Sequence, residues 1–77
     1  MRADEIRKAK QTQPFRPFVM HLADGREFAV GHPDFLFVGP VARIIILEDL
    51  DGQIEIIDPM MVTSLTRAPG EAKSPAG

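Results

Sequence analysis

Asp24-Gly25 stands between two runs in which apolar residues alternate with other residues, and this dipeptide constrains the fold more than any other feature. Asp-Gly flanked by such runs is a strong signal for a β-hairpin. We therefore expect two antiparallel strands within residues 18–30. The apolar runs that follow predict further strands of the same sheet.

The length of the hairpin loop follows from the side chains that each register places on one face. A two-residue loop, Asp24 and Gly25, would mix core and solvent residues on both faces. A three-residue loop that adds Ala23 gathers the large apolar side chains on one face. These side chains are Phe18, Met20, Leu22, Phe28 and Val30. The sequence therefore predicts the longer loop, with Gly25 in the left-handed region that glycine enters without a Cβ penalty.

At 77 residues the chain is long enough for one small domain. Such a domain buries roughly 60% of the surface of its unfolded chain and is only marginally stable alone. Small scaffolds are usually stabilised by a disulfide, a metal or a partner subunit. The sequence has no cysteine, which excludes disulfides and thiolate metal sites and is typical of a reducing cytoplasm. We therefore expect a homo-oligomer.

The net charge of −2 is distributed unevenly. Residues 1–16 hold five basic and two acidic side chains, whereas residues 17–77 hold four basic and nine acidic ones. A nucleic-acid binder usually carries a basic face on its folded body, so the acidic body argues against nucleic acid as a partner. No apolar run approaches the roughly 20 residues of a membrane span, and the N-terminus lacks the apolar segment of a secretory signal. The expected location is the cytoplasm, with no membrane partner.

Residues 3–12 predict a short helix, since acidic side chains begin it and lysines end it, as the helix dipole favours. Few of its residues are apolar, so the helix must pack against the rest of the domain to be stable. Pro14 ends it. The PFRPF segment at 14–18 predicts a stiff, extended connection to the first strand. Its P-x-x-P spacing also occurs in ligands of proline-reading domains, but the connection is the simpler interpretation.

After the hairpin, residues 31–34 predict a turn, and residues 35–38 predict either a strand or one helical turn. Residues 44–47 are apolar on both faces, which is typical of a central strand covered on both sides. Residues 49–52 predict a second, four-residue hairpin loop. The return strand is expected at 53–57.

Asp58 and Pro59 predict the cap and the first position of a 3₁₀ turn before a final strand at 61–66. The chain therefore divides into a helix or basic arm at 1–13, a small β-barrel domain at 14–67 and a disordered tail at 68–77. The expected fold class is mainly β (α+β). A short helix would precede a strongly bent antiparallel sheet or an SH3-like or Sm-like barrel of about five strands.

The segment PFRPFVMHLADGREFAVGHPDF, with the later IIDP and VTSL segments, resembles a family of short bacterial proteins. The shared motifs are PFRPF, L-x-DGR-x-F-x-V and HPDF, and they span most of the chain outside its arm and tail. This family is functionally uncharacterised, so the resemblance implies no catalytic residues.

A less specific resemblance is to Sm-like proteins, whose first motif also places a D/N-G turn between two strands, as residues 22–26 do. This resemblance implies an N-terminal helix, five bent strands, assembly through strand edges and RNA binding. The chain departs from the pattern at Asp58-Pro59, where an Arg-Gly pair is expected. The asparagine of the nucleotide pocket has no clear counterpart either. The departures argue against RNA binding and leave the barrel as an expectation.

His21, His32 and Asp34 are the candidate metal ligands. Zinc normally takes three or four ligands, and these three would meet only if the loop folded back. His21 is more simply an exposed cross-strand partner of Glu27. Asp34 is more simply a turn residue whose carboxylate accepts backbone N–H groups. We therefore predict no metal site.

Glu48, Asp49 and Asp51 resemble a fragment of a calcium loop, but an EF-hand needs flanking helices and a longer set of ligands. Ser64 lacks a nucleophile elbow around it. The sequence contains neither a phosphate loop nor a dinucleotide-binding fingerprint. These observations predict a non-enzyme without a cofactor.

The leading hypothesis is a protein-interaction module that self-associates through strand edges and surplus apolar surface. Five phenylalanines, four methionines and the apolar run at 44–47 exceed what one small barrel can enclose. The predicted contact residues are Phe35, Phe37, Ile45 and Met60. An unknown protein partner is a further possibility.

Two other hypotheses remain open. One is an Sm-like RNA-binding protein that contacts phosphates through its basic arm. The residues concerned are Arg7, Lys8, Lys10 and Arg16. The other is a metal protein or enzyme that uses His21, His32 and Asp34.

Overall fold

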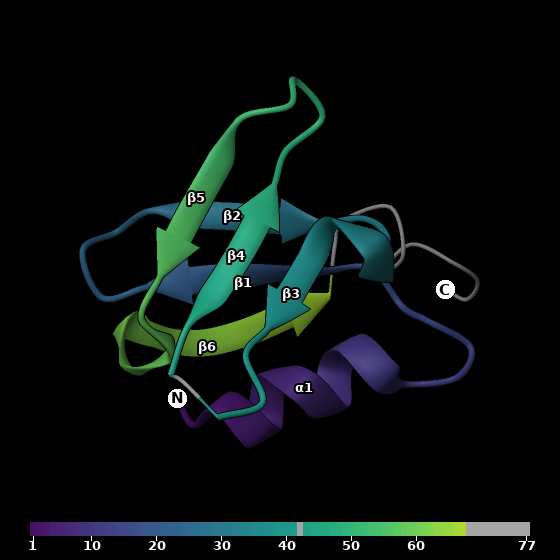
Figure 1. The fold of residues 1–77 in the computed structure, drawn as a ribbon, viewed down its shortest axis with the longest axis horizontal. Coiled ribbons are helices and arrows are strands. Elements are labelled where there is room, and N and C mark those ends of the chain that lie inside the picture. The colour runs from purple at the N-terminus through teal and green to yellow at the C-terminus, as the bar shows by residue number, and fades with distance from the viewer. Residues whose placement is uncertain (42, 68–77) are drawn as a thin grey trace.

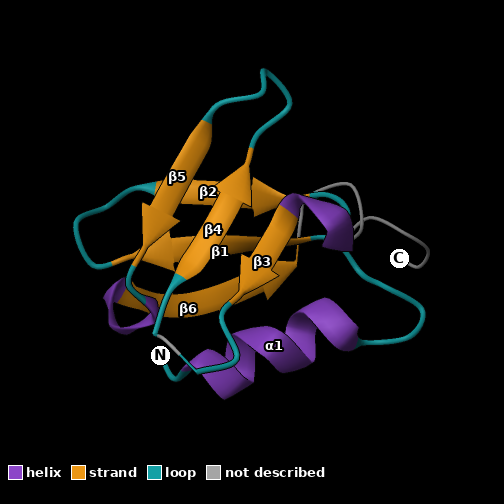
Figure 2. Ribbon diagram, viewed as in Figure 1, coloured by secondary structure: helices purple, strands orange, loops and turns teal. Residues whose placement is uncertain are grey.

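The computed structural model describes residues 1–41 and 43–67, so the tail predicted at 68–77 lies outside the described residues. Helix α1 (Ala3–Gln11) precedes six antiparallel strands (Figures 1 and 2). The strands are β1 (Phe18–Leu22), β2 (Glu27–Val30), β3 (Leu36–Val38), β4 (Ile45–Glu48), β5 (Ile54–Ile57) and β6 (Val62–Arg67). Two 3₁₀ turns, η1 (Pro33–Phe35) and η2 (Pro59–Met61), precede β3 and β6.

The strands form two three-stranded sheets, with the orders β2-β1-β6 and β3-β4-β5. In Figure 1 the second sheet crosses in front of the first, and α1 runs along one side of both. Buried apolar side chains from both sheets form the core with Ile6 of α1. The predicted class, mainly β with an N-terminal helix, is confirmed. Within the described residues, the sheets do not close into the barrel that was one of the two expected forms, and the strands number six instead of about five.

The first hairpin has the predicted register. Met20 lies opposite Phe28, and Phe18 lies opposite Val30. The Gly25 N–H donates to the Leu22 carbonyl at 3.0 Å, and Gly25 has φ +93°. The three-residue loop, the left-handed glycine and the apolar inner face of this hairpin are therefore confirmed.

The second hairpin turn is built like the first. The Asp49 N–H donates to the Gln53 carbonyl at 2.9 Å, and the Gly52 N–H donates to the Asp49 carbonyl at 3.0 Å. Gly52 has φ +82°. The loop thus has three residues, and the prediction of four was wrong. The polar side chain of Asp49 is typical of a loop residue. Its backbone N–H nevertheless pairs with Gln53 across the hairpin, so Asp49 is the last paired residue before the loop.

The two halves of the chain repeat one arrangement, a hairpin followed by a 3₁₀ turn and a third strand. The third strand of each half pairs with the first strand of the other half, so β3 joins β4 and β6 joins β1. Proline opens both 3₁₀ turns, as Pro33 and Pro59. Because the halves exchange their third strands, neither sheet is complete without residues from both.

The residues before these prolines cap the turns. An oxygen of Asp58 accepts the Met60 N–H at 2.9 Å, as predicted. At the first turn, however, His32 Nδ1 accepts the Asp34 N–H at 3.1 Å. The prediction that the Asp34 carboxylate is the acceptor was therefore wrong, because the position before the proline belongs to His32. Residues 35–38, left open between turn and strand, divide between η1 and β3.

Helix α1 ends at Gln11, one residue before the predicted boundary. Besides the buried side chain of Ile6, polar contacts hold the helix against the sheets. The Arg7 guanidinium donates to the Gly39 carbonyl at 3.0 Å and to Asp4 at 2.6 Å. The amino group of Met1 donates to the carbonyl of Pro59 at 3.1 Å. These contacts connect the helix to the end of β3 and to η2. In the described part of the chain, no helix has the length and apolar character needed to cross a membrane.

Candidate interaction surface

The outer side of the β3-β4-β5 sheet carries a row of apolar side chains. Side chains alternate across a strand, so Ile45 of β4 points into the core with 0% exposure, and Ile46 lies on the other side. Phe37 lies opposite Ile46 in the ladder, and Ile46 lies opposite Ile56. The three side chains therefore form a continuous row across all three strands of the sheet that lies in front in Figure 1.

Solvent reaches much of this row. Phe37 is 50% exposed and Ile56 is 68% exposed, while Ile54, on the same side of β5, is 63% exposed. We call Phe37, Ile46, Ile54 and Ile56 the outer apolar face. Glu48 provides the one charged side chain among the outward positions of these strands. An exposed apolar surface on a sheet is typical of an interaction site.

The structure places the four predicted contact residues differently. Phe37 belongs to the outer apolar face, whereas Phe35 is half-buried at the end of η1. Met60 is 61% exposed but lies in η2, beside a cavity next to α1. Ile45 is a core residue, so it contributes nothing to the exposed surface of the chain.

Sequence reasoning missed Ile46, because residues 44–47 have no polar–apolar alternation that would assign their sides. It also missed Ile54 and Ile56, which alternate with Glu55, because alternation alone does not say which side of a strand faces the core. The usable signal was the turn at Gly52. A three-residue loop there pairs Glu48 with Ile54, and the ladder then pairs Ile46 with Ile56.

The four basic residues of the RNA-binding hypothesis have different surroundings. Arg7 is engaged with Gly39 and Asp4, as described above. Lys8 is exposed on α1, and Lys10 is half-buried. Arg16 lines a shallow cavity of about 300 Å³, whereas Arg7 and Lys8 line a separate cavity. The structure thus does not gather the four residues around one cavity.

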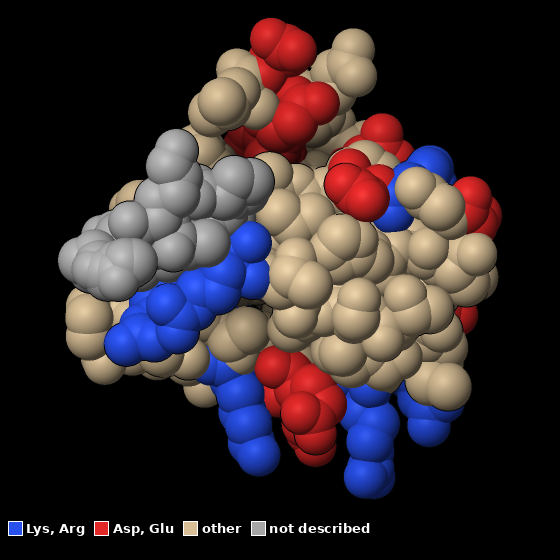
Figure 3. Space-filling view, turned by 180° about the vertical axis from the view of Figure 1, so that it is seen from behind, with Lys and Arg blue, Asp and Glu red and all other residues tan. Residues whose placement is uncertain are grey.

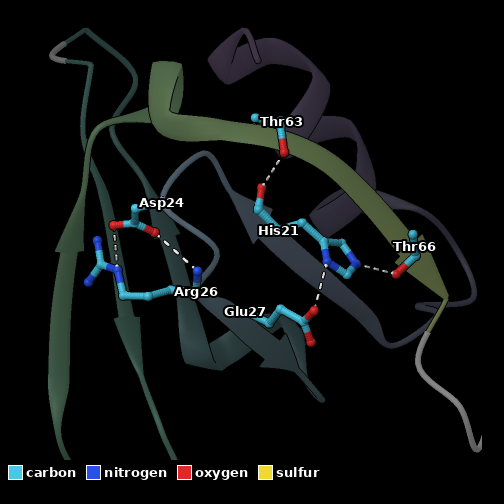
Figure 4. A network of polar contacts seen from close by, with 6 residues as sticks. All are labelled: His21, Asp24, Arg26, Glu27, Thr63 and Thr66. Carbon is cyan, nitrogen blue, oxygen red and sulfur yellow. Dashed lines mark hydrogen bonds and ion pairs between the residues drawn. The ribbon is translucent and has the colours of Figure 1, made fainter.

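A polar network crosses the first sheet (Figure 4). His21 of β1 lies between Glu27 of β2 and Thr66 of β6, with its Nδ1 at 3.4 Å from the carboxylate and its Nε2 at 2.7 Å from the hydroxyl. Thr63 also donates to the His21 carbonyl at 3.0 Å. The predicted cross-strand pair of His21 with Glu27 is confirmed. An acid, an imidazole and a hydroxyl in this order can relay a proton. Here Glu27 is largely exposed, and we interpret the network as a connection across three strands.

The three candidate metal ligands are not brought together. His32 Nδ1 lies 3.7 Å from Asp34, and His21 belongs to the separate network on β1. Within residues 1–41 and 43–67, no group of three or more His, Asp or Glu side chains is arranged to hold a metal ion.

Arg26 connects the first hairpin to the second sheet, a contact that no pattern in the sequence predicts. The Arg26 backbone N–H, donated to Asp24 at 3.1 Å, lowers the pKa of that carboxyl below its ordinary value. The Arg26 guanidinium, 2.8 Å from the same carboxylate, acts in the same direction. The guanidinium also lies 3.8 Å from Glu55 of β5 and 5.5 Å from the centre of the Phe28 ring.

Charged side chains are distributed unevenly over the molecule. In Figure 3, acidic side chains gather at the end that carries the β4–β5 turn, and basic ones project from the α1 side with an acidic group between them. The middle of this face, the outer side of the β2-β1-β6 sheet, is largely uncharged. This agrees with the uneven charge of the sequence.

No match is found when the chain is compared with protein-family profiles, with curated proteins and with solved structures. The two resemblances given above therefore stay predictions.

Proposed function

We propose that the chain is a non-catalytic protein-interaction module that forms homo-oligomers through its outer apolar face. The observation that supports this proposal is the unbroken row Phe37, Ile46 and Ile56 across an exposed side of the sheet. Burying one such side chain completely is worth about 1.5–3 kcal/mol relative to leaving it in water. Partial exposure of four of them leaves a large part of this free energy for association.

The size of the domain supports the same conclusion. A chain this short buries a smaller fraction of its surface than larger domains do. A standard interface covers about 800 Å² per partner, which is roughly a sixth of the 5099 Å² surface of the described fold. One sheet face can supply an area of that order.

A second copy fits this face by symmetry. In a twofold dimer the same patch meets itself, so an apolar face with one charged outward position meets an equally apolar face. Two sheets packed in this way lie about 10 Å apart, with their side chains interdigitated. The β3-β4-β5 sheet ends at β5, whose outer edge has no neighbouring strand in the described part of the chain, so edge pairing can extend the contact.

A matched pair of substitutions tests the proposal. Ile56→Thr removes apolar surface from the outer apolar face but keeps a β-branched side chain. Val41→Thr makes a similar change at a residue that is 93% exposed and lies outside the strands. Sedimentation velocity should show the Ile56 variant dissociating at about tenfold higher concentration than the native chain, and the Val41 variant unchanged. Equal association of all three proteins would contradict the proposal.

RNA binding through the basic arm is the alternative, supported by the exposed positions of Lys8 and Arg16. Such contacts release counterions, so the affinity must fall steeply with salt. A titration of labelled single-stranded RNA at about 50 and about 200 mM salt separates the two functions. Binding that is absent, or that does not change with salt, removes this alternative.

A further inference from the structure

A groove lies between the free edge of β2 and the tip of the β4–β5 hairpin, apart from the outer apolar face. Its volume is about 420 Å³. Its walls include Phe28 and Ala29 of β2, Phe35 of η1, and Leu47 and Leu50 of the second hairpin. Leu50 is 88% exposed and stands at the rim. The groove therefore has an apolar lining that is open to solvent.

The backbone along one wall of this groove has unused hydrogen-bonding capacity. The Leu22 N–H donates to the Arg26 carbonyl, so the hydrogen-bonded pairs of the first hairpin continue at Met20 with Phe28 and at Phe18 with Val30. The N–H and C=O groups of Glu27 and Ala29 consequently point away from β1. No described strand lies on that side of β2. These groups form an open edge of the kind to which an extended peptide adds.

The charges around the groove have one sign. Glu27, Glu48, Asp49 and Asp51 all line it, and none of the described residues that line it is basic. Glu27 has a contact with His21, and one Asp49 oxygen accepts backbone N–H groups of its own turn. Among the described residues, neither Glu48 nor Asp51 has an ion-pair partner. A cationic ligand would therefore neutralise carboxylates that have no basic neighbour among the described residues of the groove.

We propose that this groove binds an extended, cationic segment of a partner protein as an additional strand on β2. The backbone of that segment would bond to Glu27 and Ala29. Because side chains alternate along a strand, one set would pack on the apolar lining and the other would meet the acidic rim. The partner motif is thus a stretch of about five residues in which basic and apolar residues alternate. The proposal goes beyond self-association and uses a different surface.

The test uses a fluorescein-labelled peptide of sequence Arg-Val-Arg-Val-Arg-Val-Arg with blocked ends, titrated with the full chain and followed by fluorescence anisotropy. The peptide of the same charge with glycine in place of valine should bind at least about tenfold more weakly, since it lacks the apolar contacts. Asp51→Asn should weaken binding about two- to fivefold. Glu5→Gln removes one acidic charge from α1, far from the groove in the sequence, and should leave the affinity unchanged. Equal effects of the two substitutions would show non-specific attraction and overturn the proposal.

Hydrogen exchange identifies the bonded edge directly. Without peptide, the amides of Glu27 and Ala29 should exchange rapidly and those of Phe28 and Val30 slowly. With peptide, all four should exchange slowly. Unchanged exchange at Glu27 and Ala29 in the bound state would overturn strand addition, even if the peptide binds.

Two variants complete the test. Ala29→Pro removes the outward N–H but no bond to β1, and it should abolish binding. Leu50→Ser changes an exposed side chain and should weaken binding without affecting folding, which keeps the test decisive if the proline variant does not fold. Repeating the titration with Ile56→Thr separates this proposal from self-association. Peptide affinity should be the same in that variant, and its loss would assign the peptide to the outer apolar face instead.

Discussion

Two glycines set the turns from which the rest of the fold follows. Gly25 and Gly52 both have positive φ, and an ideal Cβ at either position would contact nothing within 4 Å. Their requirement for glycine therefore comes from backbone conformation and not from crowding. Each turn fixes which strand residues face inward, because a shift of one residue would reverse every side chain.

Gly25→Ala should lower the free energy of unfolding by about 1–2 kcal/mol, since an L-residue is strained in the left-handed region. Gly31→Ala is the matched control, because Gly31 also has open space and its φ is not positive. That control should change stability by no more than about 0.5 kcal/mol. Urea denaturation measures both effects. A loss of equal size at the two positions would contradict the conformational explanation.

The pH dependence of the first turn follows from Asp24. Its pKa is lowered in the folded chain, so the folded state holds this proton less tightly than the unfolded chain does. The carboxylate therefore stabilises the fold at pH values above the ordinary pKa of aspartate. This contribution is lost as the pH falls through the folded pKa.

Asp24→Asn keeps an acceptor for the Arg26 N–H and removes the charge. The native chain should be the more stable of the two at neutral pH. The difference should shrink on acidification below about pH 4. Denaturation curves recorded from about pH 7 to about pH 2 measure it. A difference that stays constant over this range would show that the Asp24 charge does not act on stability.

At the scale of the elements, the stability of α1 depends on its contacts with the rest of the domain. Its nine residues bury one side chain completely, that of Ile6. An isolated helix of this length is marginal in water. Arg7 connects it to the end of β3 through the Gly39 carbonyl.

Arg7→Ala should destabilise the chain by about 1–2 kcal/mol, because it removes a charge-assisted hydrogen bond to a half-buried carbonyl. Lys8→Ala changes the next, exposed residue and should have an effect within about 0.5 kcal/mol. Thermal unfolding followed by circular dichroism compares the two. Similar effects would mean that Arg7 acts as a general helix residue and not as a connection to β3.

The elements also show what the sequence can and cannot predict. The first hairpin was predictable to the residue, because apolar alternation and Asp24-Gly25 agree on one register. The second was predictable as a hairpin, but the polar side chain of Asp49 concealed its place in the ladder. The contact assigned to Ile45 belongs to Ile46, because residues 44–47 are all apolar. An apolar run without alternation does not reveal its sides.

At the scale of the whole molecule, the exchange of third strands decides the architecture. The pairing of β1 with β6 joins residues 40 or more positions apart, such as His21 and Ser64. No local pattern encodes such a pairing, so a bent sheet could be predicted but not its division into two sheets. The exchange joins both halves of the chain in each sheet, and one face of the second sheet is apolar and exposed.

The groove beside β2 depends on the same division. It lies between β2 of one sheet and the turn of the other, so its walls come from segments about 20 residues apart. The sequence predicts a hairpin loop at 49–52, which holds two of the acidic residues of the groove. Their position beside the open edge of β2 could not be predicted from the sequence and is seen only in the structure.

The central claim, that the outer apolar face joins copies of this chain, is tested most directly by the molar mass of the native protein in solution. Light scattering coupled to size exclusion should give twice the mass of 8.5 kDa, or a higher multiple, at about 100 µM, with dissociation on dilution. A mass of one chain at that concentration and above would contradict the account.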